Sequence, residues 1–272
     1  NYTLDPTFSC SVNGNIESLL LDGADLYIGG SSTQANGNNV ERLFRVNAST
    51  GALDNTWLPS IGSGIVSAIV RQGSFVFAGG SFTNVEGRDD NRYLVKIDAG
   101  TGLIETFFSL DNTVNDILLN GNDLIVGGIF NNLQYFKTSL AAFDIGNVVP
   151  ELTFGDVNST VDQILPDGNG GFYVCGAFNT YNSESITQIF KVQADGSLDP
   201  NFDVGSVNST VSAAHLDGDD LYIGGSFSSI QGEDVNRLAR LDATTGAIDL
   251  TWVPGTTEAG IETIETTPTK VL

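Results

Sequence analysis

The feature that most constrains the fold of this chain is a repeat of about fifty residues. A short motif that ends in an aromatic residue recurs at intervals of 46 to 51 residues along the 272-residue sequence. A glycine pair, or one glycine in the same place, recurs independently at intervals of 48 to 50 residues. The aromatic motifs lie at Leu4–Phe8, Leu53–Trp57, Ile104–Phe108, Pro150–Phe154, Leu198–Phe202 and Ile248–Trp252. Two markers with one period indicate a tandem array of a single structural unit.

Each unit is predicted to form four short strands. The first is apolar, as in residues 15–21, and ends at a turn such as Asp22-Gly23 or Asp217-Gly218, which is typical of a type I′ hairpin. The second strand follows at once and carries the glycine pair, the third is represented by Leu43–Asn47, and the fourth carries the closing aromatic. No segment has an apolar period of 3.6 residues, so we expect no helices.

Four antiparallel strands in a unit of this length are typical of a β-propeller blade. We therefore predict an all-β fold, with one β-propeller domain over residues 1–272 that holds five complete four-stranded blades of about 49 residues and part of a sixth. The units lie near residues 9–57, 58–108, 109–154, 155–202, 203–252 and 253–272. Six blades is the favoured count, with the fourth strand at residues 4–8 completing the last blade, and five blades or a larger ring are alternatives. We also expect the chain to be an excerpt of a longer protein.

The clearest units resemble a known repeat. Leu221–Phe227, Asn236–Asp242 and Gly246–Asp249 are similar to the delta-sixty repeat, and the resemblance covers essentially the whole chain. It is weakest in the third unit, where Tyr135–Lys137 interrupts a loop. The family is a β-propeller family of unknown function in large secreted and surface proteins of bacteria. This resemblance implies an extracellular or cell-surface location and export by type IX secretion, and it does not imply an enzyme.

The composition limits the classes of partner that this chain can bind and the kinds of site that its cysteines and histidine can form. The chain has 33 acidic and 11 basic residues, a formal net charge of −22, which repels nucleic-acid phosphates and anionic lipid. No apolar run has the length of a membrane-spanning helix. Cys10 and Cys175 are expected to be thiols with packing roles rather than part of a disulfide framework. The only histidine, His215, is predicted to pack between blades.

One column of polar residues follows the first apolar position of the first strand in every unit. Its members are Glu17, Ser67, Asn115, Asp162, Ser212 and Glu262. Because the innermost strands of a propeller line its channel, these side chains are predicted to form a polar ring that binds water. The alternative is a site for a hard cation such as Ca²⁺, with Glu17, Asp162 and Glu262 as candidate metal ligands. No other cofactor is predicted.

Basic residues recur at two places near the third strand. They are Arg42, Arg92 and Arg237 at the first place, and Arg45, Lys96, Lys191 and Arg240 at the second. We expect these bases to pair with carboxylates such as Asp54, Glu105 or Asp249 and to fix strand register rather than bind a ligand.

The loops between the second and third strands differ most in length and composition, and loops on a rigid scaffold commonly carry recognition. Tyr135, Phe136 and Tyr181 are the candidate ligand-binding residues, because exposed rings stack on sugars or anchor a protein partner. The alternative is that these rings cover a blade edge.

These observations predict a non-catalytic binding, adhesion or scaffold module of a larger exported bacterial protein, secreted or displayed at the cell surface. Its expected partners are proteins or glycans at the cell surface, further domains of the same chain and the secretion machinery. Nucleic acid and membrane insertion are not expected. A lectin-like carbohydrate binder is the first alternative. The second is a glycosidase or lyase with two carboxylates at the mouth of the channel.

Overall fold

The described part of this chain is built from β-strands. The computed structural model describes residues 5–89, 93–108, 110–132, 137–146, 149–151, 154–255, 259–267 and 270–271. Within these ranges every regular element is a strand, and the all-β prediction is confirmed. None of the described segments is a helix long and apolar enough to cross a membrane.

The chain forms two compact units, and the boundary falls inside the third repeat. The first unit comprises Asn1–Leu119 with Phe130–Phe136, and the second comprises Asn120–Ile129 with Lys137–Leu272.

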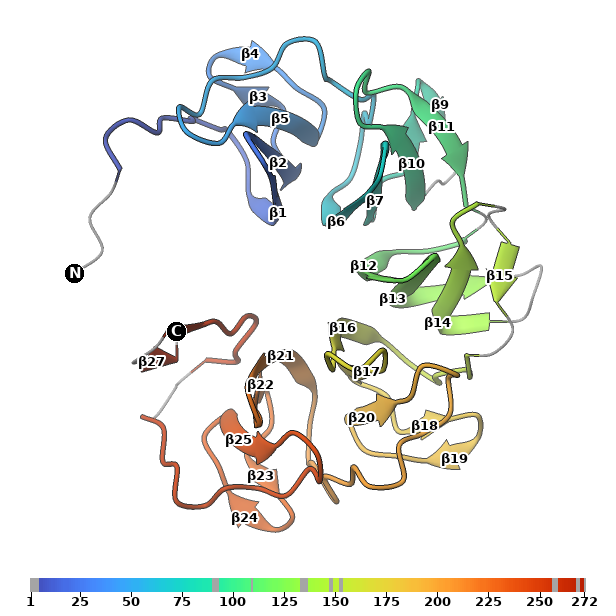
Figure 1. The fold of residues 1–272 in the computed structure, drawn as a ribbon, viewed down its shortest axis with the longest axis vertical. Coiled ribbons are helices and arrows are strands. Elements are labelled where there is room, and N and C mark those ends of the chain that lie inside the picture. Colours follow the sequence, from blue (N-terminus) through green and yellow to red (C-terminus); the bar gives the residue numbers. More distant parts are fainter. Residues whose placement is uncertain are drawn as a thin grey trace. The chain divides into compact units, whose positions relative to one another are not determined.

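The first unit contains the first two sheets, whose strands pair in the predicted order (Figure 1). The order is β1-β2-β5 in the first sheet and β6-β7-β10-β11 in the second, antiparallel at every step. A small hairpin, with two residues in each of its strands, lies between the second and third strands of each sheet. The bounds are β1 Ile16–Asp22, β2 Asp25–Gly30, β3 Gln34–Ala35, β4 Asn38–Asn39, β5 Leu43–Asn47, β6 Val66–Gln72, β7 Phe75–Gly80, β8 Asn84–Val85, β9 Arg88–Asp89, β10 Leu94–Asp98 and β11 Ile104–Phe107.

The later repeats follow the same plan. The third sheet has the order β12-β13-β14-β15, and the second unit adds the sheets β16-β17-β20 and β21-β22-β25 with a final hairpin β26-β27. Their bounds are β12 Val114–Asn120, β13 Asp123–Asn132, β14 Lys137–Asp144, β15 Val149–Glu151, β16 Val161–Pro166, β17 Phe172–Gly176, β18 Thr180–Tyr181, β19 Glu184–Ser185, β20 Ile189–Val192, β21 Val211–Asp217, β22 Asp220–Gly225, β23 Ser229–Ile230, β24 Glu233–Asp234, β25 Leu238–Asp242, β26 Thr266–Thr267 and β27 Lys270–Val271.

The fourth strand is shorter than predicted in three of the five complete repeats. In the first repeat it is a single bridge between Val46 and Leu53, and the fourth and fifth repeats have equivalent bridges. The reason is the residue that follows. Asp54 accepts hydrogen bonds from the backbone N–H of Thr56, at 2.8 Å, and from its hydroxyl, at 2.6 Å. This side-chain cap turns the backbone away from the sheet one residue after the bridge.

The turn between the first two strands is not the predicted type. In the first repeat Asp22 pairs with Asp25, so the two central residues are Gly23 and Ala24, and only Gly23 has a positive φ, of 60°. A glycine at the first central position alone is the pattern of a type II′ turn. Type I′ geometry occurs instead in the small hairpins between the second and third strands, where both Asn36 and Gly37 have positive φ.

A β-bulge interrupts the first strand at the same place in four repeats. In the second repeat Val66 pairs with Gly80 and Ala68 with Gly79, so Ser67 is the extra residue. The carbonyl of Ile65 then lies so close to Gly80 that any Cβ there would overlap it. The second glycine of the pair is therefore required by the bulge beside it.

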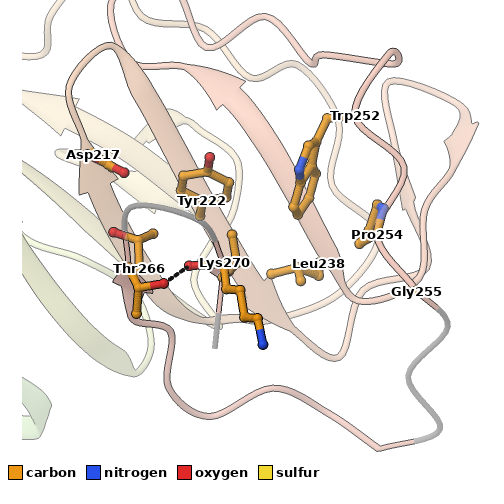
Figure 2. Close-up of a pocket in the computed structure, with 10 residues that line it drawn as sticks. Asp217, Tyr222, Leu238, Trp252, Pro254, Gly255, Thr266 and Lys270 are labelled. Atoms are coloured by element: carbon orange, nitrogen blue, oxygen red, sulfur yellow. Dashed lines mark hydrogen bonds between the residues drawn. The ribbon is translucent and has the colours of Figure 1, made fainter. Parts of the chain in front are cut away.

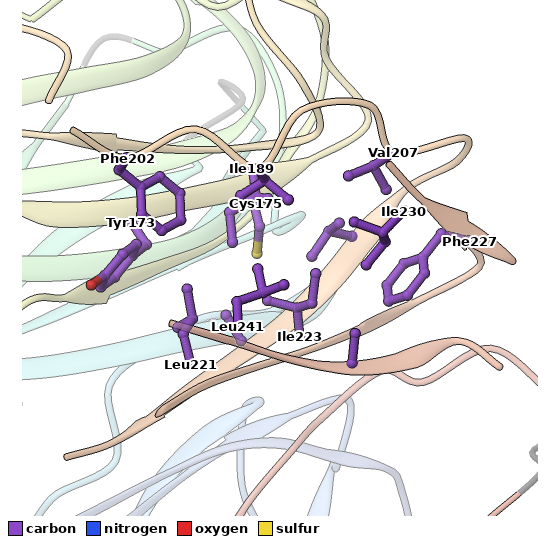
Figure 3. Packing of buried hydrophobic residues seen from close by; sticks show 14 of the residues in the cluster. Tyr173, Cys175, Ile189, Phe202, Val207, Leu221, Ile223, Phe227, Ile230 and Leu241 are labelled. Atoms are coloured by element: carbon purple, nitrogen blue, oxygen red, sulfur yellow. The ribbon is translucent and has the colours of Figure 1, made fainter. Parts of the chain in front are cut away.

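The first glycine of the pair serves the packing between successive sheets. A Cβ at Gly29 would lie 2.7 Å from Val66 Cγ1 and 2.9 Å from Ile69 Cδ1, which belong to the first strand of the next sheet. Cys175 takes this position in the fourth repeat and is buried among Ile189 and Ala214, as predicted (Figure 3). Both cysteines are present as thiols. Apolar contact between neighbouring sheets thus forms the core.

Candidate functional site

Four of the six residues of the predicted polar column are bulge residues. Glu17, Ser67, Asp162 and Ser212 are the residues skipped where the register shifts in β1, β6, β16 and β21. Because an extra residue leaves the ladder, its side chain need not enter the packed faces between sheets, so polar residues are tolerated there. At these four positions the polar residue thus coincides with a backbone geometry that recurs in four sheets.

The three candidate metal ligands differ in environment. Glu17, in the first unit, and Glu262, in the second, are exposed, whereas Asp162 is half-buried. No group of three His, Cys, Asp or Glu side chains that could hold a metal ion occurs among the residues that the structure describes. The calcium hypothesis therefore gains no ligand set in the described part of the chain.

Asp162 has the most perturbed acidity among the column residues. Burial raises the pKa of Asp162 to about 6 because the charged carboxylate loses hydration. The folded state therefore binds the proton more tightly than the unfolded state. Its contribution is most favourable below the unfolded pKa near 4 and becomes unfavourable as the pH rises through 6.

Replacing Asp162 by asparagine is accordingly expected to stabilise the protein at pH 7.5. The gain should be about 1–2 kcal/mol, less than the full pKa shift would give because the side chain is partly hydrated. Urea unfolding at pH 7.5 and at pH 4 measures it, and the gain should disappear at pH 4. Ser212→Ala, at the same bulge position, is the control without a charge. An equal gain at both pH values would contradict this explanation.

The basic residues of the third strand bind carboxylates, as predicted. Arg45 donates to Asp54, with Nε 3.1 Å from Oδ2, and its NH1 lies 3.3 Å from Asp25. Lys191 and Arg240 have equivalent partners: Lys191 lies 3.3 Å from Asp167 and 3.4 Å from Asp199, and Arg240 binds Asp220 and Asp249. The hydrogen bonds from Thr56, together with those from Arg45, lower the pKa of Asp54 to about 2. Much of the acidic composition thus has a structural role in these bridges and in the turn caps.

The other predicted basic positions are used differently. Lys96 lies over the ring of Phe75, with Nζ 3.8 Å from the centroid. Arg42 adopts a left-handed backbone, with φ of 64°, and its carbonyl accepts from the N–H of Gly30. In the second repeat the equivalent carbonyl belongs to Tyr93, so the grouping of Arg92 with Arg42 was wrong by one residue, and Arg92 itself lies outside the described residues.

Of the three candidate aromatic rings, the structure describes only Tyr181, and that ring is not exposed. Tyr181 is only 2% exposed, its hydroxyl donates to the carbonyl of Gly196, and it accepts from the N–H of Gly155 at 2.8 Å. The hypothesis that Tyr181 presents a ring to a ligand was therefore wrong, because the ring anchors the base of a hairpin. Tyr135 and Phe136 lie outside the described residues.

In the first, second, fourth and fifth repeats the loops between the second and third strands form hairpins, which the sequence analysis did not predict. In the fifth repeat Asn208 holds the hairpin base: its Oδ1 accepts from the N–H groups of Ser228 and Ser229 at 2.9 and 3.0 Å, and its Nδ2 donates to the Ser228 hydroxyl. Asn13 and Asn158 make the same three contacts in the first and fourth repeats. The repeated segment Val-Asn-Ser-Thr-Val, at 157–161 and 207–211, is the signal that would have revealed them.

Each hairpin presents a polar tip. Its base is a buried residue such as Ala35, Val85 or Ile230, whereas the tips at 36–39, 182–185 and 231–234 are exposed throughout. The central residues of the tips adopt positive φ, so the turn conformation is fixed by the type I′ geometry.

A pocket of about 500 Å³ lies beside the fifth sheet (Figure 2). Tyr222, Leu238 and Trp252 line it from the fifth repeat, and Thr266 and Val271 line it from the hairpin β26-β27. The rings of Tyr222 and Trp252 meet edge to face, with centroids 5.3 Å apart. The sequence analysis did not predict this pocket.

His215 lies near the same hairpin. Its Nε2 is 3.0 Å from the hydroxyl of Thr266, and its Nδ1 is 3.6 Å from Glu265. The expectation that His215 packs between successive repeats is confirmed.

Comparison with known proteins identifies the fold. Residues 25–56, 166–202 and 220–251 match the family model described as domain of unknown function (DUF5122) beta-propeller. Among solved structures, the chain is similar to the WD40 beta propeller domain of Doa1, with 15% identity and a TM-score of 0.56 over 92% of this chain and 71% of that one. It is also similar to the computationally designed Ika8 protein, with 10% identity and a TM-score of 0.55 over 94% and 79% of the two chains.

No curated protein matches the sequence. At such low identities the structural likeness concerns the fold alone. The predicted fold and the resemblance to the delta-sixty repeat are nevertheless confirmed: the chain has the β-propeller fold, and its first, fourth and fifth repeats match the model of the DUF5122 β-propeller family, whose function is unknown.

Proposed function

We propose that this protein is a non-catalytic binding module of an exported bacterial protein, and that it contacts a protein partner through the tips of its repeated hairpins. The observation that carries the proposal is the way the hairpins are held. A buried base, a side-chain clamp such as that of Asn208 and a type I′ turn present the same backbone shape in successive repeats. Preorganised, exposed loops lose little entropy on binding, which favours recognition.

The chemistry of the tips suits a polar partner. Asn38, Ser185, Glu233 and Asp234 are exposed and short or acidic. Such side chains form hydrogen bonds and charged contacts at an interface rather than an apolar core. Tyr181, a candidate for stacking on a sugar or anchoring a protein, is buried, so the exposed groups that the hairpins present are polar.

The secreted or surface location rests on the resemblance to the delta-sixty repeat. The proposal that the chain is not an enzyme is supported by the structural use of its carboxylates, for example Asp54 with Arg45 and Asp249 with Arg240.

Site-directed photo-crosslinking in the producing cells tests this proposal. A benzophenone amino acid at Asn38, Ser185 or Asp234 should form a cross-link to the same partner protein. This adduct should not react with a label confined to the cytoplasm, and protease added outside intact cells should degrade it. Ser49 and Thr244, exposed in the turns before the fourth strand, are the matched control positions and should give no adduct. The proposal would be contradicted if adducts formed at the control positions alone. It would equally be contradicted if the purified chain bound glycans on an array and no protein, or if it hydrolysed a polysaccharide.

A further inference from the structure

The hairpin turn between β16 and β17 has one residue more than its counterpart in the first repeat. Its sequence is Asp-Gly-Asn-Gly-Gly, at residues 167–171. Asn169 therefore stands between two glycines, and both Gly168 and Gly170 have positive φ, of 79° and 91°. Because glycine restricts the backbone least, the conformation around Asn169 can change at low cost.

The side chain of Asn169 is exposed, and it makes no hydrogen bond with any group that the structure describes. Its backbone N–H donates to Asp167 Oδ1 at 2.7 Å. The N–H of the next residue, Gly170, donates to no group within the described ranges. The side-chain amide of Asn169 and the backbone nitrogen that follows it are therefore free to react with each other.

The chain has three other Asn-Gly pairs, and in each of them the asparagine side chain is hydrogen-bonded. Asn13 Oδ1 accepts from two backbone N–H groups, and its Nδ2 donates to a hydroxyl. Asn36 Oδ1 accepts from one backbone N–H, and its Nδ2 donates to a backbone carbonyl, each at 2.9 Å. Asn120 Nδ2 donates to the carbonyl of Gly170 at 3.3 Å. Among the described residues, Asn169 is thus the one asparagine of an Asn-Gly pair whose side chain is free.

We propose that Asn169 is a site of spontaneous deamidation in the folded protein. The backbone nitrogen of Gly170 attacks Cγ of Asn169, the Cγ–Nδ2 bond breaks, and ammonia leaves with the proton of the Gly170 N–H. The product is a cyclic succinimide. Water then opens this ring at either carbonyl, which gives aspartate or isoaspartate. Glycine favours the closure because it has no side chain to obstruct the attacking nitrogen.

Both products add a negative charge to a turn that already holds a carboxylate. Asp167 Oδ1 also accepts from the N–H of Gly171, at 2.9 Å, and Asp167 Oδ2 lies 3.3 Å from Nζ of Lys191. In isoaspartate the main chain passes through the side-chain carbon, so it becomes longer between the two N–H groups that Asp167 binds. Modification of Asn169 therefore weakens this cap at the start of β17, whereas the hairpin β18-β19 follows the end of that strand.

Peptide mapping by tandem mass spectrometry, on the 272-residue protein stored at neutral pH, tests the proposal. Asn169 should be converted first, and an isoaspartate methyltransferase should label the product. Asn13 and Asn36 should react about tenfold more slowly or less, because their hydrogen bonds must break before the ring can close. Asn169→Gln, which keeps an amide but needs a larger ring, should remove the early conversion. Circular dichroism confirms that this variant is folded.

A sample unfolded in guanidinium chloride separates the effect of the fold from that of the local sequence. In this sample all the Asn-Gly pairs should react at comparable rates. The proposal would be wrong if Asn13, Asn36 or Asn120 were converted as fast as Asn169 in the folded protein. It would also be wrong if folding slowed the conversion of Asn169 as much as that of Asn36. An unchanged preference for Asn169 after unfolding would overturn it too, because the neighbouring sequence would then be the cause.

Discussion

Replacing Gly80 by alanine is expected to destabilise the first unit by about 3 kcal/mol or more. The new Cβ would overlap the carbonyl oxygen of Ile65, which is fixed in place because it accepts from the N–H of Ser81 at 2.9 Å. Gly80 does not have a positive φ, so the cost is steric overlap with backbone rather than conformational strain. To relieve the overlap, β6 must separate from β7 beside the bulge at Ser67.

Urea unfolding followed by circular dichroism measures this loss. Gly100→Ala is the matched control in the same repeat, because a Cβ there would meet only Asp98 Oδ1, at 3.4 Å, and serine or threonine takes this position in the first and fifth repeats. The control should change stability by less than about 0.5 kcal/mol. A loss below about 1 kcal/mol for Gly80→Ala would show that the bulge can move and that the glycine has another role.

The repeat and the strand order could be predicted because they depend on local patterns that recur. The glycine pair and the closing aromatic mark each unit, and short apolar runs between turns leave little choice of element. The ion pairs of Arg45 and Arg240 were predictable for the same reason, since equivalent bases faced acids in several units.

The turn types and the bulges could not be predicted, because they depend on which residues pair across two strands. Asp22-Gly23 suggested a type I′ turn, but the pairing of Asp22 with Asp25 moves the turn by one residue. The same limitation hid the bulges at Ser67 and Asp162. A one-residue shift in register reverses the face of every side chain, and sequence alone does not fix it.

The exposure of Tyr181 was predicted wrongly because tertiary contacts bury its ring. An aromatic residue in a polar loop commonly suggests exposure, but this ring fills the base of a hairpin and its hydroxyl satisfies two backbone groups. The hairpin depends on a clamp by Asn158, more than twenty residues earlier in the chain. The exposed part of this hairpin is therefore its polar tip and not the ring of Tyr181.

Trp57→Ala and Trp252→Ala are expected to differ greatly, although the two residues hold equivalent positions. Trp57 is fully buried, contacts Tyr27 and Arg45, and donates to the carbonyl of Asp98, so its removal should cost about 3–5 kcal/mol. Trp252 keeps the contact with Tyr222 but is partly exposed at the pocket, so its removal should cost about 1–2 kcal/mol.

Urea unfolding of the two variants, each compared with the unsubstituted chain, measures this difference. Because both sites have the ring pair and the guanidinium group, the difference between the two costs measures what the packing of β10 against Trp57 contributes to stability. Equal costs for the two variants would contradict this explanation, because the partly exposed Trp252 would then contribute as much stability as the buried Trp57.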